Sequence, residues 1–306
     1  MRAPAPGAIL PPVYTEHLHI PVGPGALHVE RYGRGGPAIV LLHGFGTCAF
    51  LWRAVAPRLA EQGYTALAID LLGFGESDRP PDGEFRPSAQ AAYVEQAMSA
   101  LGLGDVTVIG QDLGALVALL LAARSPTTVV RRLALLEPLD PDDLPGPDIR
   151  ALQRSSALTA LQSHAMFAVR PLLEPLLRGA VTAPEQMPDL LVARYLAPFV
   201  GSAGATDLLR LASAITLSAD DWQRLAMLRA DVLLWCGVGQ PVQAPGKSSR
   251  GGDPAGRVSR WQQLLPAATL RPVTTGVRAD TLVAEHAPAA LTAALRAWVA
   301  YTGHGR

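Results

Sequence analysis

The feature that most constrains this chain is a short turn in which an acidic residue stands between two glycines. The mostly apolar run Val106–Ile109 leads into Gly110-Gln111-Asp112-Leu113-Gly114, and apolar residues at helical spacing continue to Ala123. Small residues at positions 110 and 114 let a strand and a helix pass closely, so the pattern predicts a sharp strand-to-helix turn. Such a turn exposes the Asp112 side chain above a sheet, where the helix N-terminus favours its ionised form. Asp is also a common helix N-cap, so the residue alone leaves a purely structural role open.

Strands and helices alternate on both sides of this turn. Residues His17–Ile20 and Ala26–Arg31 alternate apolar and polar side chains around Gly-Pro-Gly, which predicts a β-hairpin. Continuous apolar runs, typical of strands buried on both faces of a parallel sheet, occur at Ala38–Leu42, Thr65–Ile69, Val106–Ile109, Leu133–Leu136, Val232–Trp235 and Thr269–Val273. Helical spacing occurs between them at Phe50–Ala60, Ser88–Ala100 and Leu113–Ala123. This order predicts an α/β fold with a parallel sheet and helices on both faces.

The alternation breaks after Leu136. From about Leu144 to Asp220 the pattern is helical and contains no strand. We therefore predict a helical cap domain at residues 144–220, inserted after the sixth strand of a core domain formed by residues 1–143 and 221–306. The Gly-, Pro- and Ser-rich segment Gly239–Gly256 predicts a long mobile loop.

Composition restricts the class of protein and its location. The 306 residues carry 26 basic and 26 acidic side chains, and this balance argues against nucleic-acid binding. No apolar run reaches the roughly 18 residues that a membrane span needs, and the N-terminus lacks signal-peptide features, so we expect a cytoplasmic protein. We expect Cys48 and Cys236 to be two buried thiols. The sequence does not indicate the oligomeric state.

Two further motifs connect the turn at Asp112 to a known family. His43-Gly44-Phe45-Gly46 follows the third predicted strand, and Asp70–Pro80 matches Asp-x-x-Gly-x-Gly-x-Ser-Asp-x-Pro. Together the motifs resemble the epoxide hydrolase and haloalkane dehalogenase branch of the α/β-hydrolase family, over nearly the whole chain. The resemblance implies a mostly parallel eight-stranded sheet with helices on both faces and a helical cap inserted after strand 6. It also implies that Asp112 attacks an sp3 carbon to form an ester, and that the backbone amides of Phe45 and Leu113 line an oxyanion site.

The chain departs from this family where a histidine should activate water. Counting back from Pro288, the histidine position holds Thr281, and His286, five residues further on, is expected to be a surface residue at the first turn of the last helix. The usual acid position after the seventh strand holds Gln240. Glu137, directly after the sixth strand, matches the alternative acid position of some dehalogenases. The resemblance therefore implies a degenerate catalytic triad.

The groups that bind a leaving halide in dehalogenases also differ. Leu113 stands where dehalogenases carry a halide-binding Trp, and Gln111 stands where a His is common. The Asn that serves as a second halide donor would sit near Phe45. These differences disfavour dehalogenation.

The predicted cap contains two ambiguous residues. Tyr195, within Arg194–Gly201, is similar to an oxirane-binding Tyr of epoxide hydrolases, although no second such Tyr is found in the cap. His164 aligns roughly with a pocket His of fluoroacetate dehalogenases, but a cap histidine packed among apolar residues is also common. Our catalytic candidates are Asp112, Tyr195 and Glu137. The substrate-binding candidates are Phe45, Gln111, Leu113, His164, Phe167, Trp52 and Thr281.

Three functions are compatible with this pattern. Attack by Asp112 needs only an acid on the leaving oxygen, whereas hydrolysis of the ester needs a base, which is typically worth about 10²–10⁴-fold. The first function is a non-hydrolytic cyclase, isomerase or lyase that uses Asp112 as acid, base or anchor on a small apolar, natural-product-like molecule. The second is an epoxide hydrolase with a relocated base, and the third is a non-catalytic ligand-binding protein. The missing histidine favours the first, for which we expect no cofactor, no metal ion and no membrane or nucleic-acid partner.

Overall fold

The computed structural model of the chain describes residues 15–124, 130–153, 169–181, 183–201, 203–236, 254–273 and 282–301. Its strands form one eight-stranded sheet in the order β1-β2-β4-β3-β5-β6-β7-β8. The bounds are β1 Thr15–Val22, β2 Gly25–Tyr32, β3 Ala38–Leu42, β4 Thr65–Ile69, β5 Val106–Gln111, β6 Val130–Leu136, β7 Asp231–Trp235 and β8 Thr269–Val273. The pairs β1–β2 and β2–β4 are antiparallel and all others are parallel, which confirms the mostly parallel eight-stranded sheet of the α/β-hydrolase fold.

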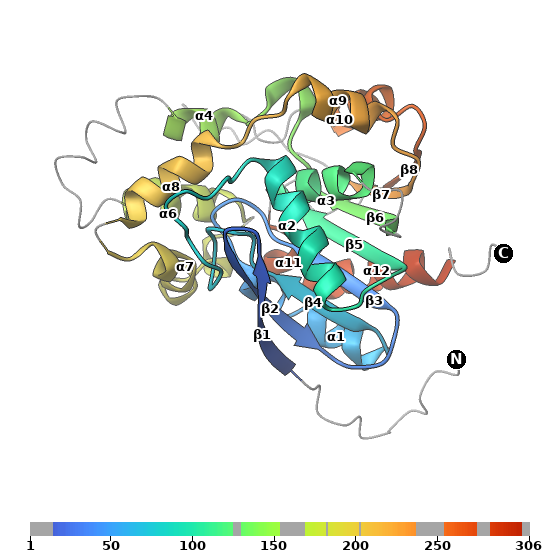
Figure 1. The fold of residues 1–306 in the computed structure, drawn as a ribbon, viewed down its shortest axis with the longest axis horizontal. Helices are drawn as coiled ribbons and strands as arrows, with labels where there is room; N and C mark the ends of the chain where they lie inside the picture. The colour runs from blue at the N-terminus through green and yellow to red at the C-terminus, as the bar shows by residue number, and fades with distance from the viewer. Residues whose placement is uncertain are drawn as a thin grey trace.

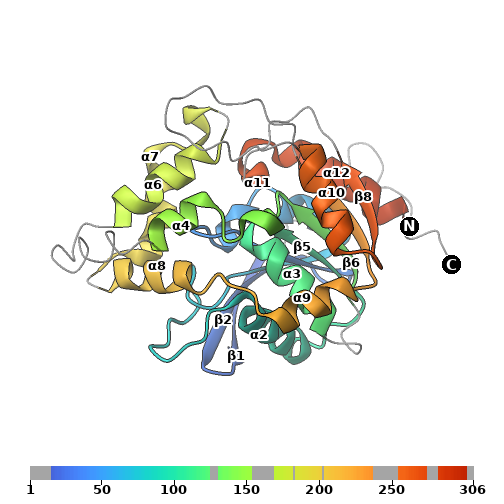
Figure 2. The same ribbon diagram turned by 90° about the horizontal axis from the view of Figure 1, so that it is seen from above.

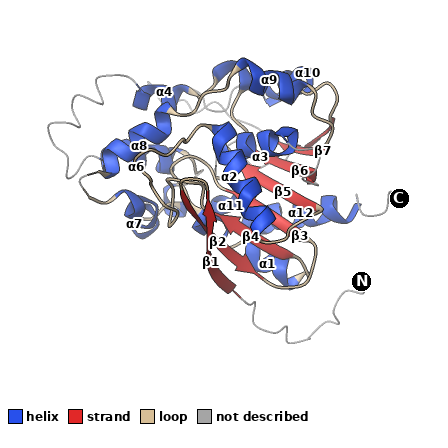
Figure 3. Ribbon diagram, in the orientation of Figure 1, coloured by secondary structure: helices blue, strands red, loops and turns tan. Residues whose placement is uncertain are grey.

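Burial along the strands follows their position in the sheet. Every residue of the central strands β4 and β5 is buried, because helices cover both faces of the sheet there (Figure 3). The edge strand β1 instead alternates between exposed and partly buried side chains up to its last residue. Continuous apolar runs and an alternating hairpin are the sequence patterns that these two environments require.

Helices pack on both faces of the sheet (Figures 1 and 2). On one face, α3 Leu113–Arg124 contacts both α2 Pro87–Ala100 and α9 Ala219–Ala226. On the other face, α1 Ala56–Glu61 contacts α12 Pro288–Tyr301. The helix predicted at Phe50–Ala60 is in fact two elements, the 3-10 turn η1 Ala49–Trp52 and then α1. Pro57 lies in the first turn of α1, since a proline ring is tolerated there but interrupts a helix that is already running.

Four more helices lie together beside the sheet (Figure 2). They are α4 Pro147–Gln153, α6 Val169–Gly179, α7 Asp189–Leu196 and α8 Gly204–Ser213. The 3-10 turn η2 Pro141–Asp143 precedes α4, η3 Pro184–Gln186 lies between α6 and α7, and η4 Ala197–Phe199 lies between α7 and α8. Helix α8 contacts both α4 and α6, and α6 contacts α7. The described part of residues 144–220 contains no strand. The division into core and cap at residues 144 and 220 stays a prediction.

The segment predicted as a loop at Gly239–Gly256 ends in a helix. Helix α10 Pro254–Leu264 begins within it, so the prediction is wrong for its last three residues, and residues 237–253 lie outside the described residues. Proline at the first helical position is favourable because its missing N–H has no helical partner there. The short helix α11 Val283–His286 precedes α12.

Two expectations from composition can be compared with this structure. Cys48 and Cys236 are both free and buried, as predicted. Burial raises the pKa of both thiols, that of Cys236 to about 12. In the part of the chain that the structure describes, no helix has the length and apolarity to cross a membrane.

Candidate active site

The turn between β5 and α3 has the conformation that the sequence predicted. Asp112 lies between them with a φ of 53°, a left-handed conformation that costs a non-glycine residue about 1–3 kcal/mol. A Cβ on Gly110 would lie 2.2 Å from the carbonyl oxygen of Gly114, and a Cβ on Gly114 would lie 2.4 Å from that of Leu42. Both glycines are therefore required for the close approach of strand and helix, which holds residue 112 in this strained position.

The loop after β3 receives the Asp112 side chain. The backbone N–H of Phe45 donates to Oδ2 of Asp112 at 2.9 Å. A Cβ on Gly44 would lie 2.9 Å from the same oxygen, so only glycine leaves room for the carboxylate. The N–H and hydroxyl of Thr47 both donate to the Gly44 carbonyl and hold the loop in shape. The Phe45 amide, expected to line an oxyanion site, thus binds the carboxylate itself.

His43 supports this loop and has a structural role. Its Nε2 accepts from the backbone N–H of Leu71 at 3.0 Å, so Nδ1 carries the proton and donates to the Gly44 carbonyl at 2.8 Å. The ring is fully buried, and burial lowers the pKa of His43. Both ring nitrogens of this neutral histidine are therefore engaged by backbone groups.

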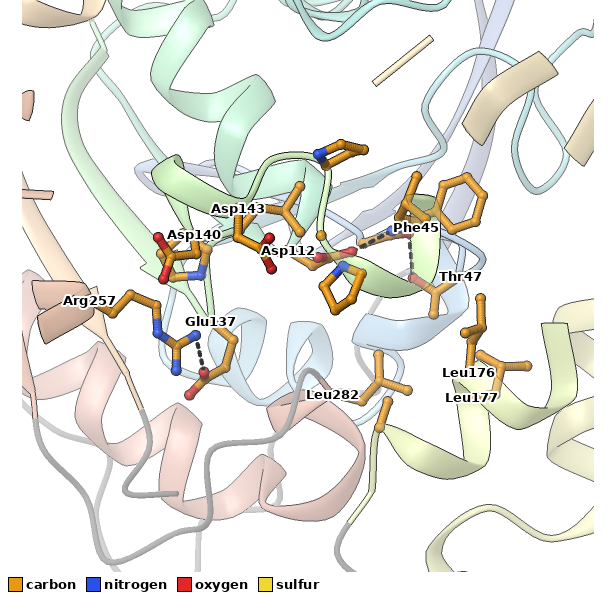
Figure 4. A pocket seen from close by; sticks show the side chains of 18 residues that line it. Phe45, Thr47, Asp112, Glu137, Asp140, Asp143, Leu176, Leu177, Arg257 and Leu282 are labelled. Atoms are coloured by element: carbon orange, nitrogen blue, oxygen red, sulfur yellow. Dashed lines mark hydrogen bonds and ion pairs between the residues drawn. The ribbon is translucent and has the colours of Figure 1, made fainter. Parts of the chain in front are cut away.

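Asp112 opens onto a cavity of about 250 Å³ between the sheet and helices α4 and α6 (Figure 4). Its walls include the apolar side chains of Leu139, Ile149, Leu176, Leu177 and Leu282. Its charged lining residues are Asp112, Glu137, Asp140, Asp143 and Arg257. Figure 4 shows Glu137 and Arg257 on one side of the cavity, and Leu176 and Leu177 on the other. The cavity is thus mainly apolar with charged groups at one end, as is usual for sites that bind small organic molecules.

Glu137 is held by a cation from a distant part of the chain. It follows β6 with a φ of 44°, and its Oε2 accepts from Nη1 of Arg257 on α10 at 3.1 Å. Both side chains are at most 9% exposed. Nη2 of Arg257 is buried and has no hydrogen-bond partner among the described residues. Breaking such a buried pair leaves an uncompensated charge, so the pair fixes the position of Glu137.

Two more arginines neutralise the other acidic residues at this end of the cavity. Arg260 on α10 pairs with Asp140, with Nε donating to Oδ1 at 2.9 Å, and Arg150 on α4 pairs with Asp143. Sequence analysis missed Arg257, Arg260 and Arg150. No local pattern links Arg257 to Glu137, because 120 residues separate them.

Tyr195 lies in a separate network. Its side chain is 1% exposed, and its hydroxyl donates to the Glu285 carboxylate. Glu285 also accepts two hydrogen bonds from Arg53, at 2.6 and 2.7 Å. Burial, followed by the charge and hydrogen bond of Glu285, raises the pKa of Tyr195 well above its usual value. Tyr195 is not among the residues that line the Asp112 cavity, so the structure does not bring these two candidates together.

The remaining candidates divide into two groups. Phe45 lines the cavity, whereas Gln111, Leu113 and Trp52 are buried in the core and do not line it. Both amide atoms of Gln111 are without a hydrogen-bond partner among the described residues. The predictions for His164, Phe167, Thr281 and Gln240 fall outside the described residues. His286 ends α11, so its expected place in the first turn of the last helix, which begins at Pro288, is wrong.

Comparisons with known proteins agree with this fold. Residues 37–161 match the model of the family described as alpha/beta hydrolase fold. The chain is similar to a haloalkane dehalogenase of Agrobacterium fabrum, with 42% identity over 113 residues, which cover 37% of this chain and 36% of that protein. It is also similar to bifunctional epoxide hydrolase 2 of Rattus norvegicus, with 33% identity over 141 residues, which cover 45% of this chain and 25% of that protein.

A solved structure extends the likeness over nearly the whole chain. Cfl2 from Burkholderia cenocepacia superposes with a TM-score of 0.74 and 26% identity, covering 92% of this chain and 95% of that one. The chain has the α/β-hydrolase fold, and the proteins it is similar to include haloalkane dehalogenases and epoxide hydrolases.

Proposed function

We propose that this protein is a non-hydrolytic enzyme that rearranges a small, largely apolar molecule in the cavity above Asp112. The observation that carries the proposal is the partner of Glu137. Some dehalogenases carry at this position the acid that orients the histidine, whereas here the carboxylate accepts a hydrogen bond from Arg257. The sequence is consistent with this, since Thr281 occupies the position where the family's motif carries the histidine.

The cavity offers the chemistry that such a reaction needs. Its apolar walls, provided by residues such as Ile149, Leu176 and Leu282, can hold a flexible substrate in a reactive conformation. A carboxyl group beside an apolar substrate can take up a proton that it would lose in water, because the charged form is poorly solvated there.

In the reaction we propose, Asp112 gives its proton to the oxygen of an epoxide as the C–O bond breaks. A hydroxyl or alkene of the same molecule then bonds to that carbon, and the proton released returns to Asp112. The product is an isomer of the substrate.

A second candidate is an epoxide hydrolase in which Asp112 is the nucleophile. The similarity to bifunctional epoxide hydrolase 2 of Rattus norvegicus supports it. In this reaction an oxygen of Asp112 bonds to the epoxide carbon, the ring C–O bond breaks, and the alkoxide takes a proton. Water must then cleave the ester, which requires a base that has been relocated from position 281. A protein that binds a ligand without transforming it is the third candidate.

One experiment separates these candidates. The protein is incubated with a panel of apolar epoxides in H₂¹⁸O, and both the small molecules and the intact protein are analysed by mass spectrometry. We expect an isomer of unchanged mass that carries no ¹⁸O. Repeated formation of ¹⁸O-labelled diol would overturn the proposal in favour of the hydrolase. A tightly bound epoxide recovered unchanged would overturn it in favour of the ligand-binding protein.

Two variants assign the activity to the site. Asp112→Asn removes the proton-transfer group and should abolish product formation. Asp143→Asn is a matched control, because Asp143 lines the same cavity but its carboxylate is paired with Arg150. If the Asp143→Asn variant lost the activity and Asp112→Asn kept it, the assignment of Asp112 would be wrong.

A further inference from the structure

The β1–β2 hairpin gathers histidines and an acid on one face. Its register pairs His17 with Glu30 and His19 with His28. Because side chains alternate along a strand, His17 and His19 on β1 lie on the same face as His28 and Glu30 on β2. The sequence patterns His-x-His and His-x-Glu thus form a four-residue patch on β1 and β2. Figure 1 shows these two strands at one end of the sheet.

Three of these residues approach one another as metal ligands do. Nδ1 of His17 lies 3.0 Å from Nε2 of His28. One ligand atom from each of His17, His28 and Glu30 lies within 4.8 Å of the others. A Zn²⁺ ion takes nitrogen and oxygen ligands at about 2.0–2.2 Å, so two ligand atoms on one ion are at most roughly 4.4 Å apart. Small rotations, which the exposed His17 ring allows, bring the three atoms into range.

A buried carboxylate already orients the central histidine. Nδ1 of His28 is 2.8 Å from Oδ2 of Asp70, and both side chains are at most 3% exposed. Asp70 is itself fixed by the backbone N–H groups of Ala49 and Glu76. This arrangement holds a proton on Nδ1 and directs the lone pair of Nε2 towards His17. Metal-binding histidines usually have such a carboxylate partner on the second ring nitrogen.

The charges around the patch also favour a cation. Glu30 is 6% exposed, and it accepts a hydrogen bond from the Tyr32 hydroxyl at 2.5 Å, which leaves it a second oxygen for ligation. The carboxylate of Glu76 lies 3.8 Å from Nε2 of His28, where it can supply a further oxygen. Imidazole and carboxylate ligands together suit Zn²⁺ better than Ca²⁺ or Mg²⁺, which prefer oxygen alone.

We propose that His17, His28 and Glu30 form a binding site for Zn²⁺. This departs from the expectation from sequence that the protein binds no metal. None of the three residues lines the Asp112 cavity, so the site is structural and independent of the proposed reaction. The ion would join the edge strand β1 to β2 and, through His28 and Asp70, to the loop that follows β4.

The test uses tag-free, metal-depleted full-length protein, titrated with ZnCl₂ in competition with a chromophoric chelator. We expect one Zn²⁺ per chain and a higher thermal unfolding temperature with Zn²⁺, because a ligand that binds only the folded state stabilises it. His17→Ala removes an exposed ligand without disturbing the core, and should weaken Zn²⁺ binding by about tenfold or more.

His19→Ala is the matched control. His19 is also exposed on the same face of β1, but it is not one of the three clustered residues. Its substitution should change the affinity by less than about threefold, well under the effect of losing a ligand. The proposal would be overturned if the wild-type protein bound no Zn²⁺, or if His17→Ala bound it as tightly as wild type. Equal weakening by both substitutions would overturn the three-residue ligand set.

Discussion

Asp112 and Glu137 form a natural comparison, because both are acidic residues at the ends of neighbouring parallel strands. Asp112 follows β5 with a φ of 53°, and Glu137 follows β6 with a φ of 44°. Both line the same cavity. Asp112 accepts from the neutral backbone amide of Phe45, whereas Glu137 accepts from the buried guanidinium of Arg257. The same strained backbone position therefore presents one carboxylate to a backbone amide and the other to a buried guanidinium.

This difference has an electrostatic cause. A buried guanidinium carries a full positive charge that compensates the charge of its carboxylate partner, so removing one member of the pair is costly. A backbone amide carries only a partial charge, so it compensates the charge of a carboxylate less than a guanidinium does. The comparison predicts that substitutions at Asp112 change activity, and that substitutions at the Glu137–Arg257 pair change stability.

The largest expected effect is on activity, in Asp112→Asn. The amide keeps the size of the side chain but cannot transfer a proton, so turnover of an isomerised epoxide should fall by about 10²–10⁴-fold. The measurement is initial rate by product chromatography, with thermal unfolding as the check that the fold is intact. Unchanged turnover would remove Asp112 from the reaction.

Arg257→Met should give the largest loss of stability. It leaves Glu137 buried without its cation, which typically costs about 3–5 kcal/mol. Urea unfolding followed by circular dichroism measures this loss. The double variant Glu137→Gln with Arg257→Met should recover most of it, because neither charge is then buried. A double variant as unstable as the single one would show that the pair is not coupled.

Asp112→Gly should stabilise the protein by about 1 kcal/mol, since glycine adopts the left-handed conformation without strain. Glu137→Gly relieves the same strain but leaves the buried Arg257 without its carboxylate partner, so it should be destabilising. Urea midpoints of the two variants, compared with that of wild type, give the sign of each change. A gain in stability for both would contradict the different roles assigned to the two acids.

The smallest expected effect is that of Arg260→Ala. Arg260 pairs with Asp140, but the two side chains are 31% and 26% exposed, so solvent screens their attraction. The loss in free energy of unfolding should be under about 1 kcal/mol, the usual range for surface pairs. If Arg260→Ala lost as much free energy of unfolding as Arg257→Met, burial would not explain the difference expected between the two arginines of α10.

The elements that sequence predicted well are those with local signals. Strands β3 and β8 begin and end at the predicted residues, and the Asp112 turn has the predicted form, because apolar runs and glycine spacing act within a few residues. The split of the predicted helix at Phe50–Ala60 was missed, although Pro57 was a visible signal for a new helix start. Asp112, Glu137 and Phe45 were predicted as site residues and do share a cavity.

The sequence by itself determined where most strands form, that Asp112 lies in a strained turn, and that position 281 holds no histidine, because each depends on residues close together in the chain. Only the tertiary structure decided which partner each charged side chain has. In the folded chain Arg257 donates a hydrogen bond to Glu137 and Tyr195 donates one to Glu285, although the partners are separated by 120 and 90 residues. Charge attraction between distant segments leaves no local pattern, and it takes effect only when folding brings those segments together.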